Sequence, residues 1–463
     1  MIGSTTIFLG LTAIVIFGLI VANLEAGLYI LLISSVFFHP LDAYQLPIGG
    51  SNIRFLDILV VMFLIAWVIR LLFTKEYRTS FKSPANKFLY AVIGILCVFL
   101  IIGIIKRRNL ITVLRDARAI TYYSSAFVIA YIIQNHKQLK KMVKFLIVLS
   151  VFSLCYYYLM RALNKPFESG LSTVTLTTES YTRSFGFYST WPYFAFSFFI
   201  IITSLLLNKL QLIRRLALWS LAIAFLFALL LILLRMYFLG LLSGSFLLFF
   251  LLWYEGKRTF IVKSLIASSA VIIILFSLYT TSKYNLMHHP IVERYLSIFT
   301  PSISTRAAMV TRQDRFEAIL YFTRSERNPI FVGEGFGDTV RDLERRHLLW
   351  HSSLGWAFYR LGIIPSIVFY LALGGILLRT IIRSQNIMNA ELKSIYYGFM
   401  CSFLFLLAIS STSGVLFDKV NEMTLVGFIL GVFLSLDNIV NNMSEEGKSA
   451  TEKQPVLTHL ARR

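Results

Sequence analysis

The chain has 463 residues, of which 57% are hydrophobic and only 14% charged, and its mean hydropathy is +0.73. Because about a quarter of a typical soluble domain is charged, this composition excludes a soluble globular protein. It indicates an integral membrane protein whose formal net charge of +21 is concentrated in its loops.

Apolar runs long enough to cross a bilayer as helices recur along the whole chain. The first run lacks a basic leader and a small-residue cleavage site, so we expect a retained helix rather than a signal peptide. The runs predict an all-α integral membrane protein, a single polytopic domain over residues 1–463 with about twelve or thirteen transmembrane helices, since the first two runs need not both cross. The expected segments lie near residues 5–22, 24–39, 55–73, 88–105, 119–134, 143–160, 192–207, 216–234, 236–254, 260–280, 353–378, 394–410 and 424–440.

Basic short loops set the expected orientation. Their alternation places one group of loops in the cytoplasm, together with a polar tail, residues 442–463, that we expect to be disordered. The cytoplasmic loops are residues 75–87, 135–142, 208–215, 255–258 and 379–393.

Two loops on the opposite, outer face are unusually rich in basic residues. Loop 106–118 reads KRRNLITVLRDAR, and the largest loop, residues 281–350, carries many charges of both signs. These are either solvated loops of mixed charge or the border of an outward-facing cavity that attracts an anion. Within 281–350, TRQDRFEAILYFTR predicts a short helix, and GEGFG, residues 333–337, predicts a backbone bend.

Arg235 is the only charged residue between Leu216 and Tyr254. As one helix this stretch would be about 58 Å long, which is two crossings. Arg235 should therefore lie at a tight reversal near the outer interface. It is either a snorkelling anchor or a functional residue. The functional role is favoured because basic anchors prefer the cytoplasmic side and no acidic residue is near in sequence.

Three further segments contain residues that could take part in binding or catalysis. Arg183, in YTRSFGFYSTWPYFAF, is either an interfacial anchor or an anion ligand. Arg312 and Arg315 share a helix face and either pair with neighbouring acids or bind phosphate. His351 opens HSSLGWAFYRLG at an expected helix start, where the helix dipole favours a neutral imidazole that can accept a proton. A packed or surface histidine is the alternative.

The chain lacks several motifs of metal or nucleophilic enzymes. We expect no DxD or DxE on the outer face and find no HExxH, GxSxG or CxxC pattern, so we expect a metal-independent protein with no cofactor. Asp57 is the main carboxylate in a predicted span. A proton or sodium relay through the bilayer would need more of them.

The order of these elements resembles the O-antigen ligase and O-antigen polymerase superfamily of bacterial envelopes. RSFGFYSTWPYFAF is similar to the family's R-x-x-G-x-F before a span, and LLRMYFLG takes the place of its S-R-G at a hairpin. RFEAILYFTRSERNPIFVGEGFG resembles R-x-x-x-W-x-x-A-L followed by P-x-x-G-x-G, and HSSLGWAFYRLG resembles H-N-x-x-L followed by E-x-G. The resemblance covers residues 180–380, while the N-terminal third agrees only in hydropathy.

Three positions depart from the family pattern. Ser352 replaces the usual Asn, Arg360 the usual Glu, and Leu234 the usual Ser before the arginine. The loop arginine of the motif is Arg312 or Arg315, with Arg315 the better spaced. These changes do not alter the expected reaction class, but the identity of the acceptor stays undetermined.

The resemblance implies a GT-C-like fold and a metal-independent, inverting transfer of a glycan from undecaprenyl pyrophosphate. The site would face the periplasm or exterior at the bacterial cytoplasmic membrane. Arginines would stabilise charge growing on the departing pyrophosphate, and His351 would orient or deprotonate the acceptor hydroxyl. The arginine candidates are Arg183, Arg235, Arg315 and Arg312, with Arg115 and Arg118 as further donor-site charges on grounds of charge alone.

Several alternatives remain open. A polymerase of surface polysaccharide is favoured over a ligase acting on lipid A–core or protein, because the H-N and E-x-G details are altered. A transporter or flippase of an anionic lipid-linked glycan would also need an arginine-lined cavity, and paired broken helices would favour it. A structural membrane scaffold is the plainest alternative. The expected partners are the lipid-linked donor, a glycan, lipid A–core or protein acceptor, and membrane lipid, with no nucleic acid.

Overall fold

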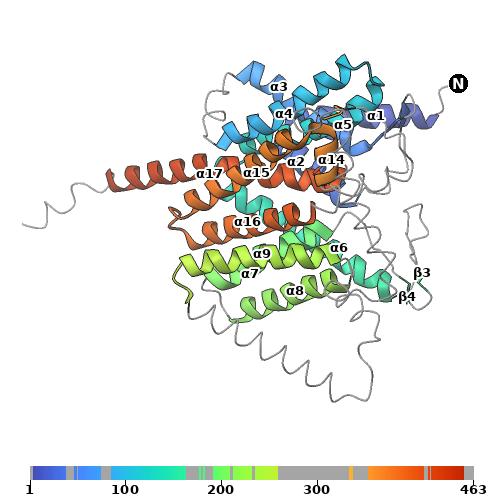
Figure 1. Ribbon diagram of the computed structural model, residues 1–463. Helices are drawn as coiled ribbons and strands as arrows, with labels where there is room; N and C mark the ends of the chain where they lie inside the picture. The colour runs from blue at the N-terminus through green and yellow to red at the C-terminus, as the bar shows by residue number, and fades with distance from the viewer. Residues whose placement is uncertain are drawn as a thin grey trace, which may run out of the picture.

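The protein is described by a computed structural model, drawn in Figure 1. It describes residues 4–37, 46–48, 51–74, 85–162, 177–178, 181–182, 191–208, 212–231, 235–258, 333–336, 353–410, 416–417 and 419–452. The expected span 260–280 and most of the large loop 281–350 lie outside these residues.

The described chain is a helical bundle with two very short antiparallel hairpins. Strand β1 (Leu46–Ile48) pairs with β2 (Ser51–Ile53), and β3 (Thr177–Thr178) pairs with β4 (Tyr181–Thr182). The helices are α1 (Ser4–Ala22), α2 (Leu24–Phe37), α3 (Phe55–Thr74), α4 (Ala85–Ile105), α5 (Leu110–Ile132), α6 (His136–Ala162), α7 (Trp191–Leu207), α8 (Leu212–Leu231), α9 (Arg235–Tyr254), α14 (Ser353–Leu361), α15 (Ile363–Ser384), α16 (Ala390–Ser410) and α17 (Val420–Glu452).

Eight of the described helices are long and apolar enough to cross a membrane. This confirms the prediction of an all-α, multi-pass membrane protein. Every expected segment within the described residues coincides with a helix, which follows because only helices satisfy their own backbone hydrogen bonds in lipid.

The helices lie side by side around α16 and α17 (Figure 1). Helix α17 packs along α5, and α16 packs against α9 and α7. In the membrane-crossing windows, 83% of α17 and 78% of α16 are buried within the protein, compared with 22% of α8. Helices α16 and α17 therefore form the core, while α8 presents most of its surface outward.

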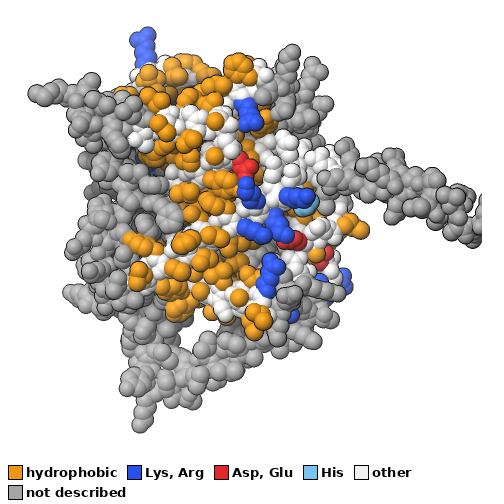
Figure 2. Space-filling model, turned by 180° about the vertical axis from the view of Figure 1, so that it is seen from behind, with side chains coloured by type: hydrophobic (Ala, Val, Ile, Leu, Met, Phe, Trp, Pro, Cys, Tyr) orange, Lys and Arg blue, Asp and Glu red, His pale blue; other side chains and the backbone are white. Residues whose placement is uncertain are grey.

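The bundle has two distinct ends, which we name after the helices that finish or begin there. At the α17 end, where α17 finishes, ion pairs join neighbouring helices, and Lys and Arg side chains gather toward one edge of the face in Figure 2. These pairs are Lys141–Glu25 at 2.7 Å, Lys140–Glu391 at 2.7 Å, Lys393–Glu255 at 3.0 Å and Arg379–Asp437 at 3.1 Å. The opposite end, where α5 begins, is the α5 end.

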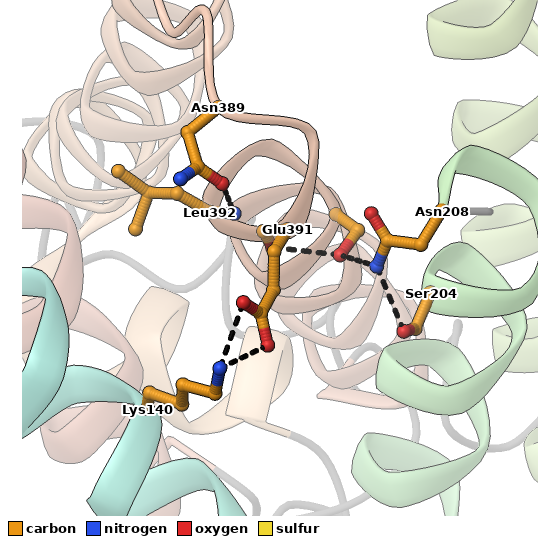
Figure 3. A network of polar contacts seen from close by, with 7 residues as sticks. Lys140, Ser204, Asn208, Asn389, Glu391 and Leu392 are labelled. Atoms are coloured by element: carbon orange, nitrogen blue, oxygen red, sulfur yellow. Dashed lines mark hydrogen bonds and ion pairs between the residues drawn. The ribbon is translucent and has the colours of Figure 1, made fainter. Parts of the chain in front are cut away.

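A polar network ties α6, α7 and α16 together at the α17 end (Figure 3). Lys140 pairs with the Glu391 carboxylate, while the Glu391 carbonyl accepts a hydrogen bond from Ser394 at 2.7 Å. Asn208, just after α7, donates to Ser394 at 3.2 Å and to Ser204 at 3.0 Å. The network fixes the ends of three helices relative to one another.

Helix α5 begins earlier than hydropathy predicted. The expected loop 106–118 is a turn only over residues 106–109, because Asn109 caps the helix by accepting hydrogen bonds from the amides of Ile111 and Thr112 at 3.0 and 3.3 Å. Arg115 and Arg118 therefore lie on a helix rather than in a loop.

Two other boundaries also differ from expectation. The single span expected at 353–378 is broken at Gly362, whose φ of 85° is a left-handed conformation that glycine adopts without steric cost. Helix α17 continues to Glu452, so the first part of the tail 442–463, expected to be disordered, is helical. The rest of that tail lies outside the described residues.

Candidate functional site

Most of the sequence-predicted site lies beyond the described residues. Arg183, Arg312, Arg315 and His351 fall outside them, so their mutual placement stays a prediction. Arg235 is the first residue of α9, and only its backbone is described. Because α8 ends at Leu231, the prediction of two helices with Arg235 at their reversal is confirmed.

Arg115 and Arg118 lie on the first turns of α5. The Nε atom of Arg115 is 3.9 Å from Oδ1 of Asp116, and the Arg115 side chain is 31% exposed. Arg118 lies with Arg54 close enough to Tyr122 to interact with it electrostatically. The two predicted donor-site arginines thus share one end of the bundle, among other charged groups.

The Tyr122 side chain links α5 to the start of α3. Its hydroxyl donates a hydrogen bond to Oδ1 of Asp57 at 2.9 Å, and Oδ2 of Asp57 accepts from the Arg54 amide at 3.3 Å. Asp57, expected as a carboxylate within a span, is therefore held by hydrogen bonds in the first turn of α3.

Arg360 and Asp116 form a buried ion pair between α14 and α5. Nη2 of Arg360 lies 2.9 Å from Oδ2 of Asp116, and the side chains are 4% and 8% exposed. Nη1 of Arg360 also donates to the carbonyl of Gly335 at 3.3 Å. The residue that departs from the family pattern is thus matched by a carboxylate from a distant part of the chain.

The segment 333–336 is clamped between α14 and α4. The amides of Glu334 and Gly335 donate to the carbonyls of Tyr359 and Arg360, each at 3.0 Å, and the Phe336 amide donates to the Phe99 carbonyl at 3.3 Å. Gly335 has a φ of 78°, which confirms the backbone bend predicted from GEGFG.

The close packing of this segment on α4 depends on Gly103. A Cβ atom at position 103 would lie 2.5 Å from the Phe336 carbonyl oxygen. Only a residue without a side chain lets the two backbones approach so closely.

Glu334 completes the contact with the turn after α4. Its Oε2 lies 3.2 Å from Nη2 of Arg108 and 3.6 Å from Nζ of Lys106. Nζ of Lys106 also donates to the Glu334 carbonyl at 3.2 Å.

We call this set of charged residues the α5-end cluster. It contains more basic than acidic side chains, so it should attract anions. Its members are Arg54, Lys106, Arg108, Arg115, Arg118, Arg360, Asp57, Asp116 and Glu334.

Sequence reasoning missed the partners that organise this cluster. Asp116 is the single acid in KRRNLITVLRDAR, and Arg360 is the single charge in an apolar helix. Those two isolated charges were the available signal, but their pairing requires knowledge of the helix packing.

Glu422 is a second buried carboxylate that was missed. Expected in a loop, it lies in the first turn of α17 with 2% exposure. Nζ of Lys419 lies 3.3 Å from its Oε1. Asp57 is therefore not the only acidic group held within the helical bundle.

Metal ligation has limited support from the described residues. No group of three or more His, Cys, Asp or Glu side chains is close enough there to hold a metal ion. The expectation that the outer face has no D-x-E spacing is wrong, because Asp342 and Glu344 form one in the large loop. Both lie outside the described part of the chain, so metal dependence must be measured.

No protein-family model matches the chain, and a search of curated proteins finds no similar sequence.

Proposed function

We propose that the protein transfers a glycan from an undecaprenyl-pyrophosphate donor to an acceptor hydroxyl. The proposal includes a GT-C-like arrangement of the bundle and a reaction on the outer face of a bacterial cytoplasmic membrane. Polymerisation of a surface polysaccharide is the favoured form, and ligation to lipid A–core or protein is the alternative.

One observation carries the proposal: all four segments with the family resemblance adjoin the same end of the bundle. Helix α9 ends at the α17 end, where Glu255 pairs with Lys393, so its first residue, Arg235, lies at the α5 end. Residues 333–336 lie there too, bonded to Tyr359 and Arg360 of α14. Helices α7 and α14, which follow the segments of Arg183 and His351, both begin there.

This convergence suits a reaction at the membrane surface. A polyprenyl tail anchors its pyrophosphate at the interface, and the α5-end cluster supplies guanidinium and ammonium groups at one end of the apolar bundle. Arg235 at the start of α9 gains nothing from the helix dipole, which disfavours a cation at an N-terminus. A bound phosphate would offset this unfavourable interaction by pairing with the Arg235 guanidinium.

The proposed chemistry balances without a further reactant. The acceptor oxygen attacks the anomeric carbon, the bond from that carbon to the pyrophosphate oxygen breaks, and His351 takes the hydroxyl proton. Arg183, Arg235 and Arg315, with Arg312, Arg115 and Arg118 in support, stabilise the negative charge that grows on the leaving pyrophosphate.

Purified protein and donor extracted from the producing cells provide the test. Activity should persist in EDTA and be lost in His351→Ala and Arg235→Ala, while Arg258→Ala, at the α17 end, should retain it. Full activity in both site variants would reject the site, and loss in EDTA would reject metal independence. Donor flipping in proteoliposomes without any transferred product would instead support the transporter.

A further inference from the structure

The buried ion pair between Asp116 and Arg360 invites a role beyond stability. We propose that these two residues form a positioning pair, which holds α14, the helix that follows His351 in the sequence, in register with the basic start of α5. The inference rests on the proposed function, since it concerns the placement of that site's proton acceptor relative to its phosphate ligands.

Helix α14 is too short to be held in position by its own stability. It has only nine residues, fewer than an isolated helix needs to be stable in water. The break at Gly362 also prevents α15 from fixing its direction through a continuous helix. The position of α14 must therefore come from contacts with neighbouring segments, which include the backbone hydrogen bonds from Glu334 and Gly335 to the carbonyls of Tyr359 and Arg360.

Three of its side-chain contacts are spread along the length of α14. At its start, the Ser353 hydroxyl accepts a hydrogen bond from the Leu416 amide at 3.1 Å. In its middle, the Trp356 ring stacks on Phe417 with the ring centroids 4.2 Å apart. At its end, Arg360 reaches Asp116 at 2.9 Å. Of these three, only the last reaches α5 and its arginines.

The presence of a buried charged pair, rather than an apolar one, favours a role in positioning over a role in stability. Burying two charges requires desolvation that their attraction often only offsets, so an apolar pair would serve stability equally well. An arginine and a carboxylate, however, meet in a narrow range of directions. The pair, together with the bond from Arg360 to the Gly335 carbonyl, specifies one register of α14, α5 and segment 333–336.

That register connects the two halves of the proposed reaction. Asp116 lies directly after Arg115 and two residues before Arg118, while Arg360 shares α14 with Ser353, two residues after His351. A shift of α14 by one ångström would move the base relative to the leaving group, and such a misplacement costs about a hundredfold in rate.

A double-mutant cycle on the full-length protein provides the first test. Asp116→Asn and Arg360→Gln should each lower kcat by about a hundredfold with little change in the donor KM, because the phosphate ligands remain. The double variant should lose no more than either single variant. Asp116→Glu, which keeps the carboxylate, should recover most of kcat.

Arg379→Gln is the matched control, because Arg379 forms the Arg–Asp pair with Asp437 at the α17 end. It should keep kcat within about twofold, as expected for a residue remote from the site. Unchanged kcat in Asp116→Asn, or equal losses in Asp116→Asn and the control, would overturn the positioning role.

A distance measurement tests the pair independently of any activity. Spin labels at Leu114→Cys on α5 and Phe358→Cys on α14, with the three native cysteines replaced, should give a narrow distance distribution. Asp116→Asn and Arg360→Gln should broaden or shift it, and Asp116→Glu should restore it. An unchanged distribution overturns the inference, whereas a broadened distribution in a protein without transferase activity would reject only the proposed function.

Discussion

The carboxylate of Glu334 lies 3.2 Å from the guanidinium of Arg108, although 226 residues separate them in the chain. This contact closes segment 333–336 over the turn between α4 and α5. It brings the C-terminal side of the large loop onto the basic residues of the α5-end cluster. The stability of this closure, and the orientation of the whole bundle, can be tested with single substitutions.

Gly103→Ala should weaken the packing of segment 333–336 on α4. The added Cβ would lie 2.5 Å from the Phe336 carbonyl oxygen, and a backbone atom cannot move aside as a flexible side chain can. We expect a loss of about 1–3 kcal/mol, as for other overpacked sites. Thermal unfolding of the purified protein in detergent measures it.

Gly94→Ala, on the same helix, is the matched control for Gly103→Ala. Nothing lies within 4 Å of a Cβ atom at position 94, so the substitution should be neutral or stabilise by up to about 1 kcal/mol. Equal melting temperatures for the two variants would contradict the packing described for residues 333–336.

Gly335→Ala should destabilise the protein more than Glu334→Gln. Gly335 has a φ of 78°, and an alanine there would cost about 1–2 kcal/mol in backbone strain. The ion pairs of Glu334 are partly exposed, with Arg108 at 28% and Lys106 at 39%, so their loss should cost about 1 kcal/mol or less. The reverse order in thermal unfolding would show that charge, rather than backbone geometry, holds the segment.

Tyr122→Phe should cost more stability than Tyr123→Phe. The Tyr122 hydroxyl donates to the Asp57 carboxylate at 2.9 Å, and a hydrogen bond to a charged group contributes about 1.5–3 kcal/mol. The Tyr123 hydroxyl donates to the neutral Leu416 carbonyl at 3.3 Å, which should contribute about 0.5–1.5 kcal/mol. The two variants lie at neighbouring positions of one helix, so thermal unfolding of each compares the two hydrogen bonds. Equal losses of stability in the two variants would argue against the hydrogen bond that links α3 to α5.

Labelling of introduced cysteines should distinguish the two ends of the bundle. In intact cells a membrane-impermeant maleimide should react with Leu110→Cys at the α5 end and leave Lys257→Cys at the α17 end unlabelled until the cells are opened. Both positions are exposed in the structure, and the basic short loops favour a cytoplasmic α17 end. Labelling of Lys257→Cys alone in intact cells would invert the proposed orientation.

The sequence predicted the helices well because hydropathy is a local property. Each apolar run within the described residues became a helix, and the isolated charge of Arg235 correctly marked a reversal. Hydropathy failed where a helix continues into polar residues. The first turns of α5 carry Arg115 and Asp116, and the last turns of α17 are polar, so both were assigned to loops.

The pairing of side chains could not be predicted for a different reason. Asp116 and Arg360 meet only because α4, α5 and α14 pack together, and no local pattern encodes that packing. The break at Gly362 was also hidden, since a glycine within an apolar run is compatible with a continuous helix. Hydropathy therefore located the membrane helices, while the contacts of the α5-end cluster emerged only from the fold.

The deep burial of α17 has a consequence for biogenesis. It is the last of the described helices to leave the ribosome, yet it fills the centre of the assembly and lies along α5. Gly427 and Gly431 of α17 pack against α5. Helix α5 is therefore inserted in the bilayer before the helix that covers its inner face has been synthesised. A nascent chain interrupted before Val420 would expose that face to lipid and become a target for membrane quality-control proteases.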